Sequence, residues 1–544
     1  MALLVSRKVL NSLGVVISKH DNFKIKWNSL NKHGKTIARN AAVVAGATLF
    51  SRILGFVRDV IVAFALGAGL FADAFIVAFR IPNLLRRLFG EGSLTMAFIP
   101  VFSRIREEEG EEAAQAMARS AMIWLCLILG SVTILVQIFA GALTMAIAPG
   151  FVGNSELFRT TVDLVRICFP YAIFICGVAL CMGILNSRSH FLGPALAPAV
   201  LNVALISAAL LGYFAGFNVA YSMAYGVVVG GICQFALQQP FLRSTGFSWR
   251  GPWSFANKGV MRMGLLMLPT VFGAAVYQIN ILLSTLLASF LPVGSVSYLY
   301  YADRLVQFPL GVFGIAVSTA ALPSLAKLAA QGELEEFDAA LAAALGLTLF
   351  IALPSAAGLI GLSSPIISIL FERGAFSAGA VTATATALVA YCAGLPFIAL
   401  SRPLVAAFYA LEDTRTPVKI AVVCLVVNVG LGYYLMQSMA HVGLALAVSA
   451  SSFINFVLLY VVLIKKRGTP LIPMASALKT VVLSCIIGLG AYFTAAWHPW
   501  WLLLIPAWAA VYLLAAHSFQ MEEAHLFTDM IRSRIRRRRS GGKA

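Results

Sequence analysis

The amino-acid sequence predicts an all-α polytopic membrane protein. Of its 544 residues, 60% are hydrophobic and only 11% are charged, whereas a soluble globular domain is usually about 25% charged. Apolar runs of about 20 residues, long enough to cross a bilayer, recur between Ala41 and Phe519. These runs are continuous, whereas transmembrane β-strands would alternate apolar and polar residues in segments of about ten. The fold class is therefore helical.

Fourteen transmembrane helices are expected along the chain, joined by short connections. They cover residues 37–66, 70–100, 118–148, 158–185, 193–215, 218–242, 260–290, 295–324, 338–362, 378–410, 417–437, 441–464, 474–496 and 499–519. Loops after even-numbered spans are rich in Lys and Arg, whereas those after odd-numbered spans contain only Arg159 and Arg373 as exceptions. The positive-inside rule therefore places the basic loops and both termini in the cytoplasm. The longest outer loop, 363–377, is long enough to dip into the membrane interface.

The first twelve spans contain an internal duplication of six spans. Segment 169–186 aligns with segment 395–412 at an offset of 226 residues, and the same offset pairs Asn202 with Asn428. Each repeat starts on the same side of the membrane, so the two would be parallel lobes related by an axis along the membrane normal. Chance similarity between Ala- and Leu-rich helices is the alternative, but matched prolines and loop positions favour duplication.

The duplication divides the chain into five parts. They are a basic N-terminal extension (1–35), an N-lobe (36–243), a C-lobe (258–466), two C-terminal helices outside the duplication (474–519) and a basic cytoplasmic tail (520–544). The extension is a poor signal peptide and fits a flexible or amphipathic segment or an upstream start choice. Fifteen of the 40 Lys and Arg residues lie in the two tails. The net charge of +18 therefore points to anionic membrane lipids and not to nucleic acid.

Charged residues inside the expected spans mark a candidate site. They are Arg52, Arg58 and Asp59 in span 1; Asp73, Arg80, Arg86, Arg87 and Glu91 in span 2; Asp303 and Arg304 in span 8; and Arg402 in span 10. Each costs at least about 2.5–3.5 kcal/mol at a helix centre, so such residues are usually paired or face a watery cavity. The excess of arginine predicts a central cationic cavity between the lobes for an anionic substrate, such as a diphosphate. The alternative is that the arginines pair with the acids and lock the helices together.

Helix geometry refines the choice of candidates in span 2. Asp73, Arg80 and Arg87 are spaced by seven residues and share one stripe. Pro82 removes a backbone hydrogen bond and kinks the helix, which allows Arg86 to turn inward as well. We therefore include Arg80 and Glu91 among the candidate substrate-binding residues. The expected hinges are Gly55, Pro82, Gly90 and Gly92.

The sequence carries no signature of an enzyme, a cofactor or a metal site. It lacks the GxxxxGK[ST], HExxH and GxSxG patterns that mark nucleotide binding, zinc hydrolysis and serine nucleophiles. Its eight cysteines lie in apolar runs without CxxC spacing, which is typical of small buried residues. Asn280, Asn428 and Asn455 are polar positions inside spans, and helix–helix hydrogen bonding is the role expected for each.

Four strings carry a family resemblance: SRILGFVRD, ADAFIVAFRIPNLLRRLFGEG, GSVSYLYYADRLVQFPLGVFG and TPVKIA. Through them the sequence resembles the MurJ (MviN) family of lipid II flippases, within the multidrug/oligosaccharidyl-lipid/polysaccharide exporter superfamily, over about residues 36–520. The resemblance implies substrate-binding residues at Arg52, Arg58, Asp73, Arg86, Ser297 and Arg304. It implies a groove for the lipid tail at spans 13 and 14. Gln307 departs from the pattern, because some members have an acidic residue there.

The resemblance also implies an activity. The substrate would be the undecaprenyl-diphosphate-linked peptidoglycan precursor, lipid II, moved from the inner to the outer leaflet of a bacterial cytoplasmic membrane. We expect alternating access by a monomer, with Asp73 pairing with an arginine when the outer side is closed. Cell-wall synthesis proteins are further partners that the resemblance allows. The alternatives are a related exporter of another polyprenyl-diphosphate-linked oligosaccharide, and a membrane scaffold that transports nothing.

Overall fold

The computed structural model describes residues 44, 46–88, 94–311, 315–468, 474–495 and 501–528. The extension 1–35 and most of the basic tail lie outside these residues, and so do Gly90, Glu91 and Gly92. The described residues form helices and connecting turns without a β-strand, as the fold class requires. By length and composition, eight of the described helical segments can cross a membrane.

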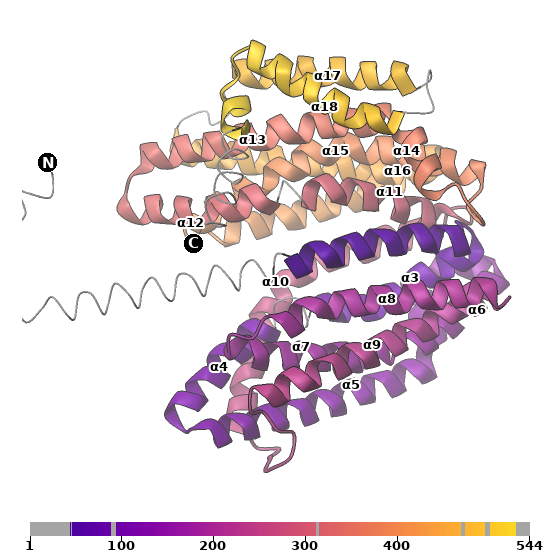
Figure 1. Cartoon of the computed structure of the whole chain (residues 1–544), viewed down its shortest axis with the longest axis vertical. Helices are drawn as coiled ribbons and strands as arrows, with labels where there is room; N and C mark the ends of the chain where they lie inside the picture. The colour runs from indigo at the N-terminus through magenta and orange to yellow at the C-terminus, as the bar shows by residue number, and fades with distance from the viewer. Residues whose placement is uncertain are drawn as a thin grey trace, which may run out of the picture.

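The helices follow the expected spans in order, and Figure 1 shows their arrangement. The first helix covers residues 46–66. It is followed by α3 (Leu70–Leu85), α4 (Leu94–Glu108), α5 (Glu111–Ile147), the 3₁₀ turn η2 (Pro149–Gly153), α6 (Ser155–Cys168), α7 (Tyr171–Ser187), α8 (Leu192–Phe214), α9 (Val219–Ser244), α10 (Lys258–Ser289), α11 (Ser295–Pro309), α12 (Ile315–Gln331), α13 (Leu334–Gly361), α14 (Ser363–Phe371), α15 (Ala378–Ala410), α16 (Arg415–Arg467), α17 (Met474–Ala495) and α18 (Trp501–Ser518).

Some expected spans are divided and two are joined. Span 2 is made of α3 and α4, span 4 of α6 and α7, and span 8 of α11 and α12. Pro170 stands at the α6–α7 break, where a missing N–H ends the helical hydrogen bonding. Spans 11 and 12 run together as α16, and only Ala440 there has non-helical angles (φ 47°, ψ −129°). The number of segments that cross the bilayer stays a prediction.

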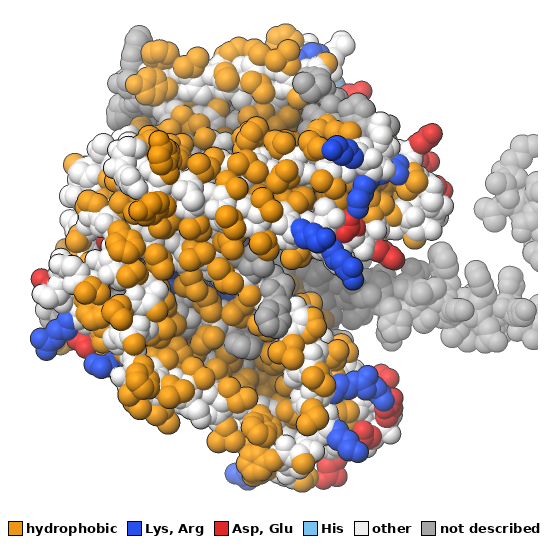
Figure 2. Space-filling view, turned by 180° about the vertical axis from the view of Figure 1, so that it is seen from behind, with side chains coloured by type: hydrophobic (Ala, Val, Ile, Leu, Met, Phe, Trp, Pro, Cys, Tyr) orange, Lys and Arg blue, Asp and Glu red, His pale blue; other side chains and the backbone are white. Residues whose placement is uncertain are grey.

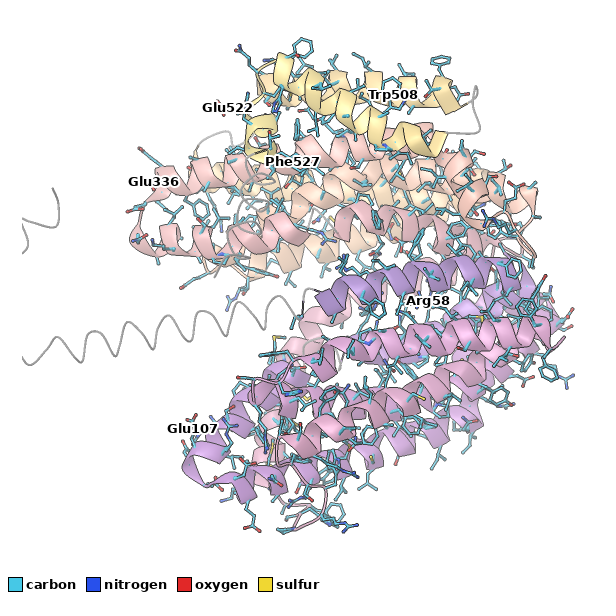
Figure 3. The ribbon with its side chains drawn as sticks, viewed as in Figure 1. Arg58, Glu107, Glu336, Trp508, Glu522 and Phe527 are labelled. Atoms are coloured by element: carbon cyan, nitrogen blue, oxygen red, sulfur yellow. The ribbon has the colours of Figure 1, made fainter. Side chains whose placement is uncertain are left out.

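The helices form two lobes, with α17 and α18 on the outer flank of the second lobe (Figure 1). The lobes meet at one end and diverge toward the end where Glu107 and Glu336 lie (Figure 3). Figure 2 shows a broad hydrophobic surface over both lobes, with charged side chains gathered mainly at the diverging end. We call the diverging end the inner end, because the basic loops lie there, and the opposite end the outer end.

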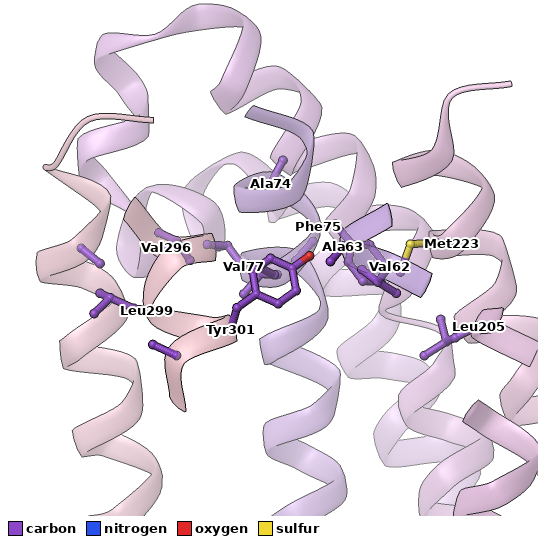
Figure 4. Packing of buried hydrophobic residues seen from close by; sticks show 14 of the residues in the cluster. Val62, Ala63, Ala74, Phe75, Val77, Leu205, Met223, Val296, Leu299 and Tyr301 are labelled. Carbon is purple, nitrogen blue, oxygen red and sulfur yellow. The ribbon is translucent and has the colours of Figure 1, made fainter. Parts of the chain in front are cut away.

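The hydrophobic core joins the two lobes at the outer end. One cluster contains residues of both lobes, and Figure 4 shows Val296, Leu299 and Tyr301 of α11 in it together with Phe75 and Val77 of α3. Toward the inner end each lobe has a cluster of its own, one around α4, α5 and α7 and the other around α13, α15 and α16. Helix α10 passes from one lobe to the other, since it packs on α4 and α5 and also on α16.

Two equivalent asparagines support the duplication. In the first lobe Asn202 accepts a hydrogen bond from Arg58 (3.0 Å) and donates one to the Ser51 carbonyl (3.1 Å). In the second lobe Asn428 donates to Asn280 (2.9 Å) and to Ser284 (3.4 Å). Asn280 and Ser284 lie on α10, the first helix of the second repeat. The same buried amide therefore holds the first helix of each repeat, and the expected helix–helix role of Asn280 and Asn428 is confirmed.

Candidate functional site

A cavity of about 830 Å³ lies between the two lobes. Helix 46–66, α3, α8, α10, α11 and α15 contribute most of its polar wall. Its charged lining residues in the described part of the chain are Arg58, Arg80, Arg86, Arg87, Asp303, Arg304 and Arg402. Six guanidinium groups thus face one carboxylate, and such a surface attracts anions with several oxygen atoms.

Asp59 joins two of these arginines across the lobes. Its Oδ1 accepts hydrogen bonds from Arg58 Nη2 (2.6 Å) and Nε (3.0 Å) in the same helix. Its Oδ2 lies 3.6 Å from Arg304 Nε of the second lobe, and the Tyr300 hydroxyl donates to Oδ1 (3.2 Å). The Arg304 guanidinium also stacks over the Tyr300 ring at 4.8 Å. One buried carboxylate therefore neutralises half of the charge of this arginine pair.

The other arginines of span 2 reach the cavity because α3 changes its winding. Pro82 lies inside α3, and residues 86–88 form a π-helical turn, which is wider than an α-helical turn and shifts the side chains after it. Arg86 and Arg87, which an unbroken helix would point about 100° apart, both line the cavity. Arg86 Nε donates to Asn83 (2.8 Å). Arg80 donates to the Thr285 hydroxyl and to the Ile281 carbonyl of α10.

Asp73 and Ser297 lie outside the cavity lining, at the outer end. The Asp73 carboxylate is buried and accepts hydrogen bonds from the Gly294 amide (2.6 Å), the Ser297 amide (2.8 Å) and the Ser297 hydroxyl (2.5 Å). It thus caps the N-terminus of α11, where the helix dipole favours a negative charge. In this structure Asp73 bonds to a helix start of the other lobe, and not to an arginine as the sequence led us to expect.

Two close backbone contacts seal the outer end further. The Ala375 amide, just after α14, donates to the Phe64 carbonyl (2.9 Å), and the Tyr301 hydroxyl donates to the Gly67 carbonyl (3.1 Å). A Cβ atom on Gly67, whose φ is +70°, would lie 2.4 Å from the Ala375 carbonyl oxygen. The loop 363–377 therefore closes against the first lobe, a role that its composition did not reveal.

The positions of two residues of the first helix, Arg52 and Gly55, differ from those expected from the sequence. Arg52 is exposed and absent from the cavity lining. Its Nη1 atom would lie 2.5 Å from a Cβ atom on Gly311, so its guanidinium lies against the end of α11. Gly55 stays within a continuous helix and faces the Asn202 side chain. No bend is present at Gly55 in this conformation.

Several polar residues of the cavity were not singled out from the sequence as site residues. They include Asn83, Asn202, Thr285, Tyr300 and Tyr391. Tyr300 lies close to Asp303 and Arg304 in the sequence, and this proximity is the sequence feature that could have marked it as a site residue. Asn202 appears in the sequence analysis through its alignment with Asn428. Gln307 donates to Asp303 Oδ2 (3.1 Å), so it contacts the carboxylate of the preceding turn and not Arg304.

A second, apolar groove of about 620 Å³ lies beside the cavity. Helices α13, α14, α17 and α18 form most of it, and Trp508 and Phe527, both labelled in Figure 3, are among its lining residues. Phe56 lines this groove, whereas Arg58 lines the cavity. The first helix therefore separates a charged compartment from a hydrophobic one. Within the described residues, no group of three His, Cys, Asp or Glu side chains is placed to hold a metal ion.

These features define a class of protein: a two-lobe α-helical membrane transporter with an internal cavity that is closed at the outer end. The fold is similar to that of a solved multidrug resistance MATE family transporter of the MOP superfamily in an inward-facing conformation, with a TM-score of 0.65 and 14% identity. That similarity covers 79% of this chain and 98% of the transporter.

The family model described as lipid II flippase MurJ matches residues 62–512, and this chain belongs to the MurJ family. It is 37% identical to the lipid II flippase MurJ of Burkholderia cenocepacia over 439 residues, which are 79% of this chain and 84% of the relative. It is 36% identical to the probable lipid II flippase MurJ of Vibrio cholerae, over 78% of this chain and 82% of the relative. A solved structure of lipid II flippase MurJ in an inward closed conformation is 29% identical, with a TM-score of 0.76 over 88% of this chain and 99% of that structure. The chain is thus a multi-pass bacterial membrane protein.

Proposed function

We propose that this protein flips lipid II from the inner to the outer leaflet of the bacterial cytoplasmic membrane by alternating access. The observation that carries the proposal is the cavity between the lobes, whose lining has six arginines and one aspartate. Lipid II has a diphosphate between its sugar and its polyprenyl chain. Guanidinium groups hold phosphate oxygens with pairs of parallel hydrogen bonds. Membership of the MurJ family supports this substrate.

The loading step would use the end at which the lobes diverge. Arg52 of helix 46–66, which is exposed and lies against the end of α11, contacts the headgroup first. The diphosphate then reaches Arg58, Arg86 and Arg304. Because Asp59 binds both Arg58 and Arg304, the phosphate oxygens compete with this carboxylate for the same guanidinium groups. The polyprenyl tail occupies the apolar groove beside α17 and α18. The headgroup and the tail are thereby held on opposite sides of helix 46–66.

The transport step would follow from release of the outer end. Breaking the Asp73–Ser297, Phe64–Ala375 and Gly67–Tyr301 contacts separates the lobes there. The bend in α3 at Pro82, and the expected hinges at Gly55, Gly90 and Gly92, would absorb the change in helix direction. Both chain termini and the basic loops would lie in the cytoplasm. No residue is assigned a catalytic role, since moving a lipid between leaflets breaks no covalent bond.

A related exporter of another polyprenyl-diphosphate-linked oligosaccharide would use the same diphosphate chemistry. The relatives described above are named for lipid II, which disfavours this alternative. Complementation tests the choice directly. Expression of this chain in a strain depleted of its own lipid II flippase should restore growth and cell shape. A chain that inserts into the membrane but restores neither would contradict the proposal.

A further inference from the structure

We propose that a groove between α5 and α6, at the outer end of the first lobe, binds an anionic phospholipid with one phosphate and a hydroxylated headgroup, as in phosphatidylglycerol. The groove has a volume of about 500 Å³ and lies outside the arginine cavity and the apolar groove described above. Its polar lining residues are Arg159, Asp163 and Arg166 of α6. They are spaced by four and three residues and share one face of the helix.

The two arginines of this groove are poorly neutralised by the protein. Arg166 Nη1 lies 3.8 Å from Asp163 Oδ1, and both side chains are exposed (45% and 38%). This separation is too long for a hydrogen bond. In the described part of the chain, no carboxylate lies within 4.0 Å of the Arg159 guanidinium. The lining thus carries two positive charges and one negative charge, with donors free to meet an anion.

The backbone of α5 is irregular beside the groove and forms hydrogen bonds with Arg166. Phe139 has non-helical angles (φ −102°, ψ 22°) and interrupts α5 beside the groove. Just before it, Gln137 Nε2 donates to the Arg166 carbonyl (2.8 Å), and Arg166 Nε donates to the Gln137 carbonyl (3.2 Å). This reciprocal pair fixes the arginine but uses one of its five N–H groups. The four Nη protons remain available for phosphate oxygens.

The surroundings favour a lipid over free phosphate. The α5 face beside the groove is apolar and exposed: Ile134, Leu135, Ile138, Phe139 and Met145 are each 54–62% exposed. In a bilayer this face contacts acyl chains, so a lipid would place its headgroup at the arginines and its chains along α5. Arg159 also stands at the outer end, where topology disfavours basic residues. A lipid phosphate supplies a counter-charge to Arg159 and Arg166.

Asp163 selects the type of headgroup. It lies between the two arginines in sequence, and its Oδ2 accepts a hydrogen bond from Tyr221 at 3.3 Å. The carboxylate repels a second phosphate, and its other lone pairs can accept hydrogen bonds from headgroup hydroxyl groups. One phosphate with neighbouring hydroxyls matches this set of donors and acceptors, whereas a diphosphate does not.

Site-specific photo-crosslinking tests the proposal. The full chain, with Ala142 replaced by a photoreactive benzoyl-phenylalanine, is reconstituted in vesicles of one part phosphatidylglycerol and three parts phosphatidylethanolamine. Mass spectrometry identifies the attached lipid. We expect phosphatidylglycerol to be enriched about tenfold over its share, given the strength of charge-assisted hydrogen bonds. Crosslinks that mirror the vesicle composition, or that join another protein, would overturn the proposal.

Variants separate a specific site from general attraction to a positive protein. Arg159→Gln removes a charge that has no carboxylate partner among the described residues and leaves the Gln137–Arg166 pair intact, so folding should be preserved. It should abolish most of the enrichment. Arg243→Gln, at an exposed position of the inner end, should leave the enrichment unchanged. Equal enrichment in Arg159→Gln and in the unmodified protein would contradict a specific lipid-binding site at these arginines. The readout is lipid binding, so it does not depend on flipping.

Discussion

Asp73 and Ser297 join the two lobes through a buried carboxylate, which accepts both the backbone and the hydroxyl hydrogen bond of the serine. Together with the Gly294 amide, they make the first turn of α11 part of the seal at the outer end. The contact involves a full charge and three donors, so it is a strong link between the lobes. Its loss should favour conformations that are open to the outside.

Asp73→Asn should open the outer end. The amide nitrogen of asparagine would face an N–H group at the start of α11. Hydrogen bonds to charged groups contribute about 1.5–3 kcal/mol, so the ratio of closed to open molecules should fall about tenfold or more. Spin labels at the exposed positions Val152 and Ser377, in a cysteine-free background, would report a longer distance by double electron–electron resonance. Ser297→Ala should have a smaller effect, since both amide bonds remain. An unchanged distance distribution in Asp73→Asn would refute the seal.

Gly67→Ala should destabilise the contact at the outer end, because the backbone angle at this position and the nearby Ala375 carbonyl leave no room for a Cβ atom. The alanine would adopt a positive φ and meet the Ala375 carbonyl at 2.4 Å, and backbone strain of this kind costs about 1–3 kcal/mol. Gly69→Ala is the matched control, since its φ is −165° and a Cβ atom there meets nothing within 4 Å. Thermal unfolding of the purified proteins should show a lower midpoint for Gly67→Ala alone. Equal midpoints would show that the contact does not require glycine.

Asn202→Ala should weaken both the first lobe and the activity. It removes the hydrogen bonds to Arg58 and to the Ser51 carbonyl, which costs about 1–3 kcal/mol when a buried partner is left unsatisfied. Asn428→Ala removes the equivalent bonds of the second lobe, which involve no arginine. We expect a similar loss of stability in both variants but a larger loss of flipping in Asn202→Ala. A parallel loss of flipping in both would show that Asn202 does not act through Arg58.

The apolar groove can be blocked without changing the cavity. Ala509 lines the groove, whereas the neighbouring exposed Ala510 is absent from its lining. Ala509→Trp should fill the groove and slow the flipping of lipid II about tenfold, because the tail loses contact area worth about 25 cal/mol per Å². Ala510→Trp should remain active. The tail does not use this groove if both variants flip lipid II at the rate of the unmodified protein.

The sequence predicted the helical fold from its continuous apolar runs. The cost of charge in hydrocarbon marked the six arginines that line the cavity as charges inside spans, and their role in binding substrate stays a prediction. Arg58, Arg80, Arg86 and Arg304 had to face water or pair with an acidic residue. The partner of Asp73 could not be predicted, since its hydrogen bonds go to backbone amides more than 200 residues away. The fit of Gly67 against Ala375 depends likewise on how the lobes dock. Glu91 lies outside the described residues, so its role stays a prediction.

Measuring lipid II flipping by purified protein in proteoliposomes tests the central claim most directly. The unmodified chain should move lipid II between leaflets, whereas Arg86→Ala and Arg304→Ala should insert normally and lose most of this activity. Arg104→Ala is the control, because Arg104 is exposed and its ion pair among the described residues is with Glu108 in the neighbouring turn of α4. This variant should flip lipid II normally. Full activity in both cavity variants would contradict the assignment of the arginine cavity as the lipid II site.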